Sequence, residues 1–158
     1  MDIIASYFFQ LPNDHLQMCF RFERTNITFT LYGTLMNKNS CYAFYGSLRR
    51  GMFNYQKFKD HLEYLFTENL PGFRLHAMDH YPMALITHSP NDIIRAEIMR
   101  VTDASTEKAI HDLEIKAGYY YDEVTVRGNK VGIYLFRESG KYPLVPGGDW
   151  IHFFRQKE

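Results

Sequence analysis

Alternating apolar and polar positions at the start of the chain predict extended structure. Strand-forming residues run from Ile3 to Phe9 and from Leu16 to Phe22, and the turn-forming residues 12–14 (Pro-Asn-Asp) lie between them. A further stretch, residues 27–35, carries Thr, Phe and Tyr in alternation. The pattern therefore predicts a β-hairpin followed by another strand.

The next segment predicts a strand, a loop with glycines and a helix. Residues 42–45 form a short apolar strand that leads into the sequence Gly-Ser-Leu-Arg-Arg-Gly at 46–51. Asn54 is a suitable N-cap for a helix that ends before Pro71, because apolar residues recur at three- and four-residue spacing. The predicted apolar face of this helix consists of Tyr55, Phe58, Leu62 and Leu65.

The second half of the chain predicts four strands and one further helix. The predicted strands are residues 82–86, 93–101, 119–126 and 130–136. A turn at 89–92 follows the first of them, and Gly128-Asn129 joins the last two as a hairpin. Asp103 is a good N-cap for a helix through Ala117 that ends at Gly118, and residues 143–148 predict a loop.

This succession of elements indicates the fold class. About eight predicted strands accompany two predicted helices, without the regular alternation of a doubly wound sheet. We therefore expect an α+β fold in which a small mixed or antiparallel β-barrel is flanked by two or more helices. A length of 158 residues is that of one domain, so we expect residues 1–158 to form a single domain.

Composition and charge exclude several classes of protein. With 46% hydrophobic and 23% charged residues the chain is typical of folded proteins. Eighteen Lys and Arg balance eighteen Asp and Glu, which leaves no excess positive charge for a nucleic acid. No apolar run reaches the roughly 18 residues of a membrane span, and the N-terminus lacks a secretory pattern. We expect a cytoplasmic protein without nucleic-acid or membrane partners, and the oligomeric state is left open.

Cysteines and histidines do not form a metal-binding pattern. Cys19 and Cys41 lie far apart without neighbouring ligands, and the seven histidines lack the usual short spacings. His76 and His80 are four residues apart, but the prolines around them argue against a regular helix. We expect no metal, no disulfide and no cofactor.

The loop that follows residues 42–45 is the first candidate site. A strand that ends at Gly46 exposes consecutive backbone N–H groups beside the hydroxyl of Ser47, and such a loop can hold a carboxylate. An ordinary turn before a helix is the alternative interpretation. Ser47 does not stand in a Gly-x-Ser-x-Gly sequence, so the pattern does not favour a nucleophilic serine.

Glu114 is the second candidate. In the predicted helix Ile110, Leu113 and Ala117 form the buried stripe, and Glu114 lies at its margin. Partial burial raises the pKa of a carboxyl towards neutrality, as a general acid or base at pH 7 requires. A solvated helix carboxylate is the alternative. The tyrosine run 119–121 either fills a strand or lines a pocket beside this carboxylate.

Together these residues resemble the gamma-glutamylcyclotransferase-like family. The segment 45–51 (Tyr-Gly-Ser-Leu-Arg-Arg-Gly) with Asn54 is similar to the glycine loop of that family. Residues 81–85 are similar to the family's proline-led strand. Residues 96–101 and 110–114 resemble the strand and helix that end in its catalytic glutamate, and residues 147–150 resemble its tail. The resemblance covers roughly residues 42–153, which implies a family core at 41–153 and a β extension at 1–40.

The resemblance implies an enzyme that cyclises the glutamyl group of a γ-glutamyl amine or γ-glutamyl amino acid. The glutamyl α-amine would attack its own γ-carbonyl and release 5-oxoproline and an amine, with no cofactor and no covalent intermediate. Glu114 would be the general acid and base, with the loop holding the α-carboxylate and two tyrosines orienting Glu114 or lining the pocket. The implied substrate-binding residues are Tyr45, Gly46, Ser47, Leu48 and Tyr120. The leaving amine stays open among an amino acid, a peptide, a polyamine and a lysine side chain.

Two other functions also fit the sequence. Ile115 stands where the family often has glycine, and Asp122 stands where an arginine often follows the tyrosine. These departures favour a module that binds a small acid or peptide end without turning it over. The aromatic-rich N-terminal hairpin favours a structural or interaction domain.

Overall fold

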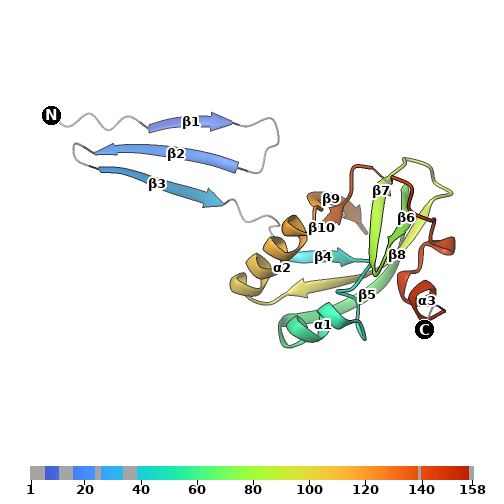
Figure 1. Ribbon diagram of the computed structural model, residues 1–158. Coiled ribbons are helices and arrows are strands. Elements are labelled where there is room, and N and C mark those ends of the chain that lie inside the picture. Colours follow the sequence, from blue (N-terminus) through green and yellow to red (C-terminus); the bar gives the residue numbers. More distant parts are fainter. Residues whose placement is uncertain (1–5, 11–15, 24–25, 34–38, 139, 157–158) are drawn as a thin grey trace. The chain divides into compact units, whose positions relative to one another are not determined.

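The computed structural model divides the chain into two compact units, residues 1–38 and 39–158. The described residues are 6–10, 16–23, 26–33, 39–138 and 140–156. Each unit has its own sheets (Figure 1), and each is considered by itself. The expectation of a single domain stays a prediction.

The N-terminal unit is a three-stranded antiparallel sheet. Its strands β1 (Ser6–Gln10), β2 (Leu16–Glu23) and β3 (Asn26–Gly33) lie in the order β1-β2-β3. Each pairs with its sequence neighbour in an unbroken antiparallel register. The predicted hairpin and following strand are confirmed, while the predicted turn at 12–14 lies outside the described residues.

A five-stranded sheet forms the centre of the unit 39–158. Its strand order is β5-β8-β4-β10-β9, with β4 and β10 parallel and the other pairs antiparallel. The strands are β4 (Cys41–Phe44), β5 (Leu62–Pro71), β8 (Ile93–Val101), β9 (Tyr120–Val126) and β10 (Asn129–Leu135). The predicted hairpin of β9 and β10 and the predicted strands β4 and β8 are confirmed.

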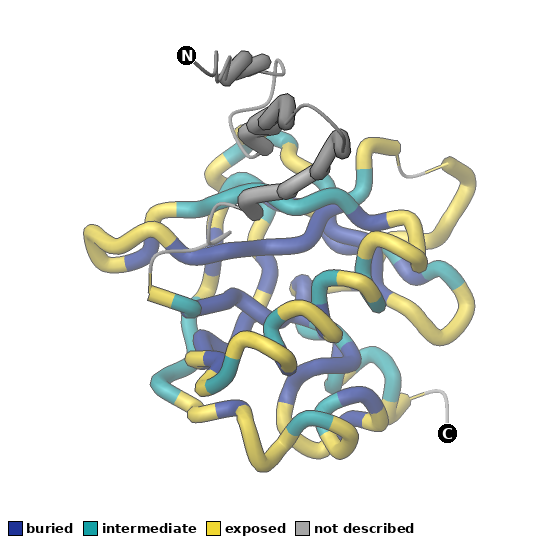
Figure 2. Tube along the Cα trace, turned by 90° about the vertical axis from the view of Figure 1, so that its left-hand side faces the viewer, coloured by how far each residue is buried: buried dark blue, intermediate teal, exposed yellow. Residues whose placement is uncertain are grey.

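The interior strands of this sheet carry the core. All four residues of β4 are buried, and Ile94, Ala96 and Ile98 of β8 are almost completely inaccessible. Glu97 and Met99 on the opposite face of β8 are buried as well, because both faces of the strand are covered. Figure 2 shows buried segments through the middle of the unit and exposed loops around it.

A separate hairpin consists of β6 (Phe73–Met78) and β7 (Tyr81–Ile86). The sequence analysis identified β7, but β6 was not predicted. Among the described residues, strand pairing does not join this hairpin and the five-stranded sheet into a closed barrel. The α+β class is confirmed, and the barrel remains an expectation.

The helix predicted from Asn54 through Leu65 is wrong in its second half. The helical structure consists of α1 (Phe53–Phe58) and the 3₁₀-helix η1 (Lys59–His61), after which the chain enters β5. Strand β5 pairs with β8 along its length. It also contains residue types that favour strands, namely Tyr64, Phe66 and Thr67. Strand pairing thus prevails over a helical spacing of apolar residues.

The other helices follow local capping signals. In α2 (Ala104–Lys116) the Asp103 carboxylate accepts hydrogen bonds from the N–H groups of Ser105 and Thr106, both at 3.0 Å. Downstream come the 3₁₀-helix η2 (Pro146–Gly148), inside the predicted loop, and α3 (Trp150–Arg155), which lies on the side of the unit away from α2 (Figure 1). In the described part of the chain, no helix is long and apolar enough to cross a membrane.

Candidate active site

The loop after β4 packs directly against the start of β7. A Cβ added at Gly46 would lie 2.4 Å from the Cγ atom of Pro82, well inside the contact distance of two carbon atoms. The proline ring cannot swing away as the end of a flexible side chain can. Gly46 is therefore required by the close approach of Pro82.

Hydrogen bonds fix the conformation of the loop. The Arg49 N–H donates to the carbonyl of Gly46 at 3.0 Å, and the Tyr55 N–H donates to the carbonyl of Ser47 at 3.0 Å. The side-chain amide of Asn54 donates to Oγ of Ser47 at 2.9 Å. Asn54 is thus a buried residue within α1 that positions the hydroxyl, whereas the predicted N-cap position belongs to Met52.

The first three backbone N–H groups of the loop have no acceptor among the described residues. Among the residues that the structure describes, those of Gly46, Ser47 and Leu48 donate no hydrogen bond to another residue. Ser47 and Leu48 are nonetheless buried. Buried N–H groups in proteins nearly always have an acceptor. Because these three have none among the described residues, a bound anion could supply it, and the loop is suited to hold one.

A buried group of ion pairs anchors the loop from behind. Arg49 is only 4% exposed, and its Nη1 lies 2.7 Å from Oδ1 of Asp149, the N-cap of α3. Its Nε lies 3.9 Å from Oε1 of Glu97 on β8. Glu97 also accepts a hydrogen bond from the Arg50 N–H at 2.9 Å. The loop is thereby tied to the interior strand β8 and to the start of the last helix.

Glu114 reaches the site from α2. Ile110, one turn earlier, belongs to the core, and Glu114 is half-buried at the margin of the same face. Burial raises the pKa of Glu114 from 4.5 to about 7. Within residues 39–138 and 140–156, no Lys or Arg pairs with its carboxylate, so no positive charge offsets the cost of desolvation.

A cavity of about 180 Å³ lies between the loop and α2. This volume is below the usual range for drug-sized ligands and suits a small molecule. The predicted site residues that line it are Tyr45, Gly46, Ser47, Leu48 and Glu114. The sequence analysis did not assign to the site the lining residues Phe53, Lys57, Tyr81, Leu113 and Tyr134.

Tyr119, and not Tyr120, stands in the cavity wall. The Tyr119 hydroxyl donates to the carbonyl of Pro82 at 2.7 Å, and burial, followed by the nearby Glu114, raises its pKa. Tyr120 is half-buried on β9, where the Arg137 guanidinium lies 4.7 Å from the centre of its ring. Tyr119 therefore lines the cavity directly, whereas Tyr120 is not among the lining residues.

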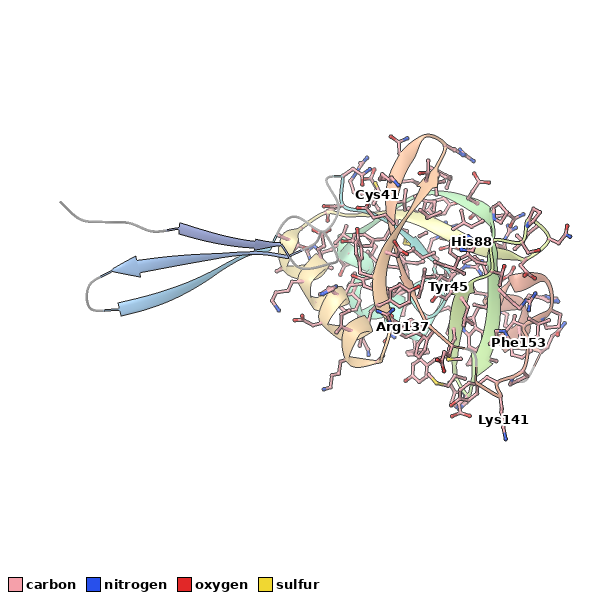
Figure 3. The ribbon with its side chains drawn as sticks, turned by 90° about the horizontal axis from the view of Figure 1, so that it is seen from above. Cys41, Tyr45, His88, Arg137, Lys141 and Phe153 are labelled. Carbon is pink, nitrogen blue, oxygen red and sulfur yellow. The ribbon has the colours of Figure 1, made fainter. Side chains whose placement is uncertain are left out.

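Tyr45 and Tyr134 complete the wall. Tyr45 lies in the interior of the unit (Figure 3), and its hydroxyl donates to the carbonyl of Tyr134 at 2.5 Å. The Tyr134 hydroxyl lies 3.3 Å from Nδ1 of His111, and burial, followed by Glu114, raises the pKa of Tyr134. The hydroxyl of Tyr45 is thus engaged with the backbone, which makes this residue a wall rather than a donor to a ligand.

The two departures from the family pattern lie outside the cavity. Ile115 is 45% exposed on α2, and the Asp122 carboxylate accepts a hydrogen bond from the Glu123 N–H at 2.7 Å. Neither residue lines the cavity. The two departures, Ile115 in place of glycine and Asp122 in place of arginine, therefore concern positions outside the cavity wall.

The cavity offers few ligands to a metal ion. Among its described lining residues, Glu114 is the only carboxylate, and none is His or Cys. The described part of the chain also holds no group of three His, Cys, Asp or Glu arranged as metal ligands. Loop N–H groups, one carboxylate and one lysine suit a small zwitterionic organic molecule better.

Comparison with known proteins gives a family and a fold. The family model described as gamma-glutamyl cyclotransferase, AIG2-like, matches residues 42–152. A search of curated protein sequences found no match. The fold is similar to that of an uncharacterised protein from Pyrococcus horikoshii, with a TM-score of 0.63 and 21% identity over 74% of this chain and 94% of that one.

Two other solved structures are similar over most of their length. The Escherichia coli protein ytfP has a TM-score of 0.54 and 22% identity, over 70% of this chain and 96% of that one. An AIG2-like protein from Mus musculus has a TM-score of 0.54 and 18% identity, over 70% of this chain and 93% of that one. At these identities the likeness establishes the fold alone.

Proposed function

Because the chain belongs to the gamma-glutamyl cyclotransferase, AIG2-like family, we propose that it cyclises the glutamyl group of a γ-glutamyl compound to 5-oxoproline and releases an amine. The observation that carries this proposal is the half-buried Glu114, whose pKa is raised to about 7, in the same small cavity as the loop 45–48. A carboxyl with this pKa serves as both base and acid near neutral pH.

The reaction needs a proton carrier rather than a protein nucleophile. In the proposed first step, ionised Glu114 takes a proton from the substrate's α-ammonium, and the amine attacks the γ-carbonyl carbon to form the five-membered ring. The bond from that carbon to the leaving nitrogen then breaks, and protonated Glu114 gives its proton to this nitrogen. Glu114, ionised again, takes the second excess proton from the ring nitrogen and passes it to the released amine. The products are 5-oxoproline with a neutral ring nitrogen and an ammonium ion, and Glu114 ends ionised as it began. Ring closure within one molecule has the entropic advantage of an intramolecular reaction.

The loop supplies the complementary charge. In the proposed complex, the N–H groups of Gly46, Ser47 and Leu48 donate to the substrate's α-carboxylate, which places the α-amine on the side of Glu114. These N–H groups lack protein acceptors among the described residues, which supports this assignment. The mostly apolar wall excludes water and so strengthens both interactions.

A binding module without catalysis is the alternative function. Ile115 and Asp122 motivated it, but both lie outside the cavity wall, and the carboxylate and loop remain in place. These observations favour the enzyme.

The test is release of 5-oxoproline, measured by mass spectrometry with a panel of γ-glutamyl amino acids, γ-glutamyl amines and glutathione. We expect Glu114→Gln to lower kcat by at least about a hundredfold, because it removes the general acid and base. Asp112→Asn, at an exposed position on the same helix, is the matched control and should keep full activity. Circular dichroism and the Tm verify that both variants fold.

Two results would contradict the enzyme. One is a folded wild-type protein that releases no 5-oxoproline from any donor of the panel. The other is full activity in a folded Glu114→Gln variant. In the first case, calorimetric binding of the same compounds would support the binding module.

A further inference from the structure

The mouth of the cavity carries an uncovered aromatic pair. Phe53 on α1 and Tyr81 on β7 both line the cavity, yet they are 42% and 44% exposed. Their rings pack edge to face with centres 6.0 Å apart, an arrangement that holds both of them in place. The mouth thus offers a preformed and exposed apolar surface.

Lys57 stands next to this pair. It follows Phe53 by four residues on α1, which puts both on one side of the helix, and it also lines the cavity. It is exposed, and in the described part of the chain no carboxylate forms an ion pair with it. Among the described lining residues it is the only cation, since the other charged one is Glu114.

The charges of the proposed substrate show what Lys57 is left to do. The glutamyl group has two charged ends, an α-ammonium that meets Glu114 and an α-carboxylate that meets the N–H groups of residues 46–48. Lys57 then has no partner on the glutamyl group. A negative charge on the leaving group would supply that partner.

We propose that the leaving group is an amino acid with a large apolar side chain, recognised by its own carboxylate on Lys57 and by its side chain on Phe53 and Tyr81. This inference rests on the proposed function and selects among the leaving amines that the sequence left open. A polyamine would carry positive charge towards Lys57. A lysine side chain would place its carboxylate four methylene groups from the leaving nitrogen, and an extended peptide has a neutral amide where the carboxylate is needed.

Two substrates that differ only in the leaving carboxylate test the role of Lys57. These are γ-glutamyl-phenylalanine and γ-glutamyl-phenethylamine. We compare their kcat/KM values with the wild type and their Kd values with Glu114→Gln, measured by calorimetry. The wild type should prefer γ-glutamyl-phenylalanine by about twofold to fivefold, the usual size of one exposed ion pair.

In Lys57→Met, the kcat/KM value for γ-glutamyl-phenylalanine should come close to that for γ-glutamyl-phenethylamine. In the double variant with Glu114→Gln, the Kd values of the two compounds should become nearly equal. Lys59→Met is the matched control, because Lys59 is exposed on η1 and does not line the cavity. It should leave the ratio of the two kcat/KM values as in the wild type. An equal loss for both substrates in Lys57→Met would overturn the proposal and assign Lys57 to the glutamyl carboxylate.

The aromatic pair is tested with side chains of different size. We expect Phe53→Ala to lower the preference for γ-glutamyl-phenylalanine over γ-glutamyl-glycine by about threefold to tenfold, because apolar contact is lost. Tyr142→Ala is the control, since Tyr142 is 41% exposed and lies outside the cavity wall. An unchanged preference in Phe53→Ala would overturn this part of the proposal.

The binding measurements separate this inference from the proposed function. A wild type that turns over no donor would contradict the enzyme, but the Kd ratios would still test Lys57 and Phe53. Turnover of γ-glutamyl donors with no preference for a leaving carboxylate would contradict the inference and leave the enzyme intact.

Discussion

The two walls of the cavity are built in opposite ways. The loop wall is held from every side, with Gly46 against Pro82, Asn54 on the Ser47 hydroxyl and the buried Arg49 behind. The helix wall presents Glu114 without an ion pair to any described residue. A rigid set of donors thus faces a carboxylate that the protein leaves without a partner.

This difference follows from what each wall has to do. Donors that bind an anion work best when they are fixed before it arrives. A carboxyl that exchanges protons at neutral pH must instead avoid cations, because a neighbouring Lys or Arg would lower its pKa. Leaving Glu114 half-buried and unpaired therefore serves the proposed reaction, although it makes the ionised carboxylate costly.

The largest effect is expected when the support of the loop wall is removed. Arg49→Met breaks buried ion pairs and leaves Glu97 and Asp149 with fewer partners, so the free energy of unfolding should fall by about 3–5 kcal/mol. Urea unfolding measures this change. Arg100→Met is the control, because its ion pair with Glu63 is exposed and should contribute less than about 1 kcal/mol. If Arg49→Met lowered the free energy of unfolding by no more than Arg100→Met does, the loop would not depend on Arg49.

A smaller effect is expected at the contact between the loop and β7. In Gly46→Ala the new methyl group would meet the Pro82 ring, which should cost about 1–3 kcal/mol of stability and displace the loop N–H groups. We expect kcat/KM for 5-oxoproline release to fall with it. Pro82→Ala removes the colliding ring atoms, so the double variant should recover part of the stability lost in Gly46→Ala. Strictly additive losses would contradict this contact as the cause.

The smallest effect distinguishes two neighbouring tyrosines. Tyr119→Phe removes the hydrogen bond to Pro82 and should lower the free energy of unfolding by about 1 kcal/mol, with a measurable change in KM. Tyr120→Phe should change neither quantity appreciably, because Tyr120 is outside the cavity wall. The reverse order of effects would return Tyr120 to the site and contradict the described wall.

Local signals made parts of this molecule predictable. Asp103 and Gly118 delimit α2 through capping and a left-handed turn, with a φ of +96° at Gly118, and helical spacing alone places Glu114 at the margin of its buried face. The glycine loop at 45–51 was identified as a motif. These features depend on residues close together in sequence.

The rest depends on contacts between distant segments. Leu62 and Leu65 fit a helical stripe, but pairing with β8 makes them part of β5. Lys57 and Tyr134 reach the cavity only because α1 and β10 come together around it, and no spacing in the sequence signals this. The requirement for Gly46 becomes apparent only with Pro82 beside it. Strand β6 was missed although its own pattern signals it, since the buried residues Phe73, Leu75 and Ala77 alternate with more exposed ones.

The most direct test of the central claim is the pKa of Glu114 in the folded protein. Side-chain carboxyl carbons of ¹³C-labelled glutamate can be titrated by NMR, and the Glu114→Gln variant assigns the resonance. Because burial without a neighbouring cation raises the pKa, the midpoint should lie near 7, about the value that a shared acid and base requires. A midpoint near the ordinary value of 4.5 would contradict the account, since Glu114 would then be a fully ionised carboxylate at neutral pH.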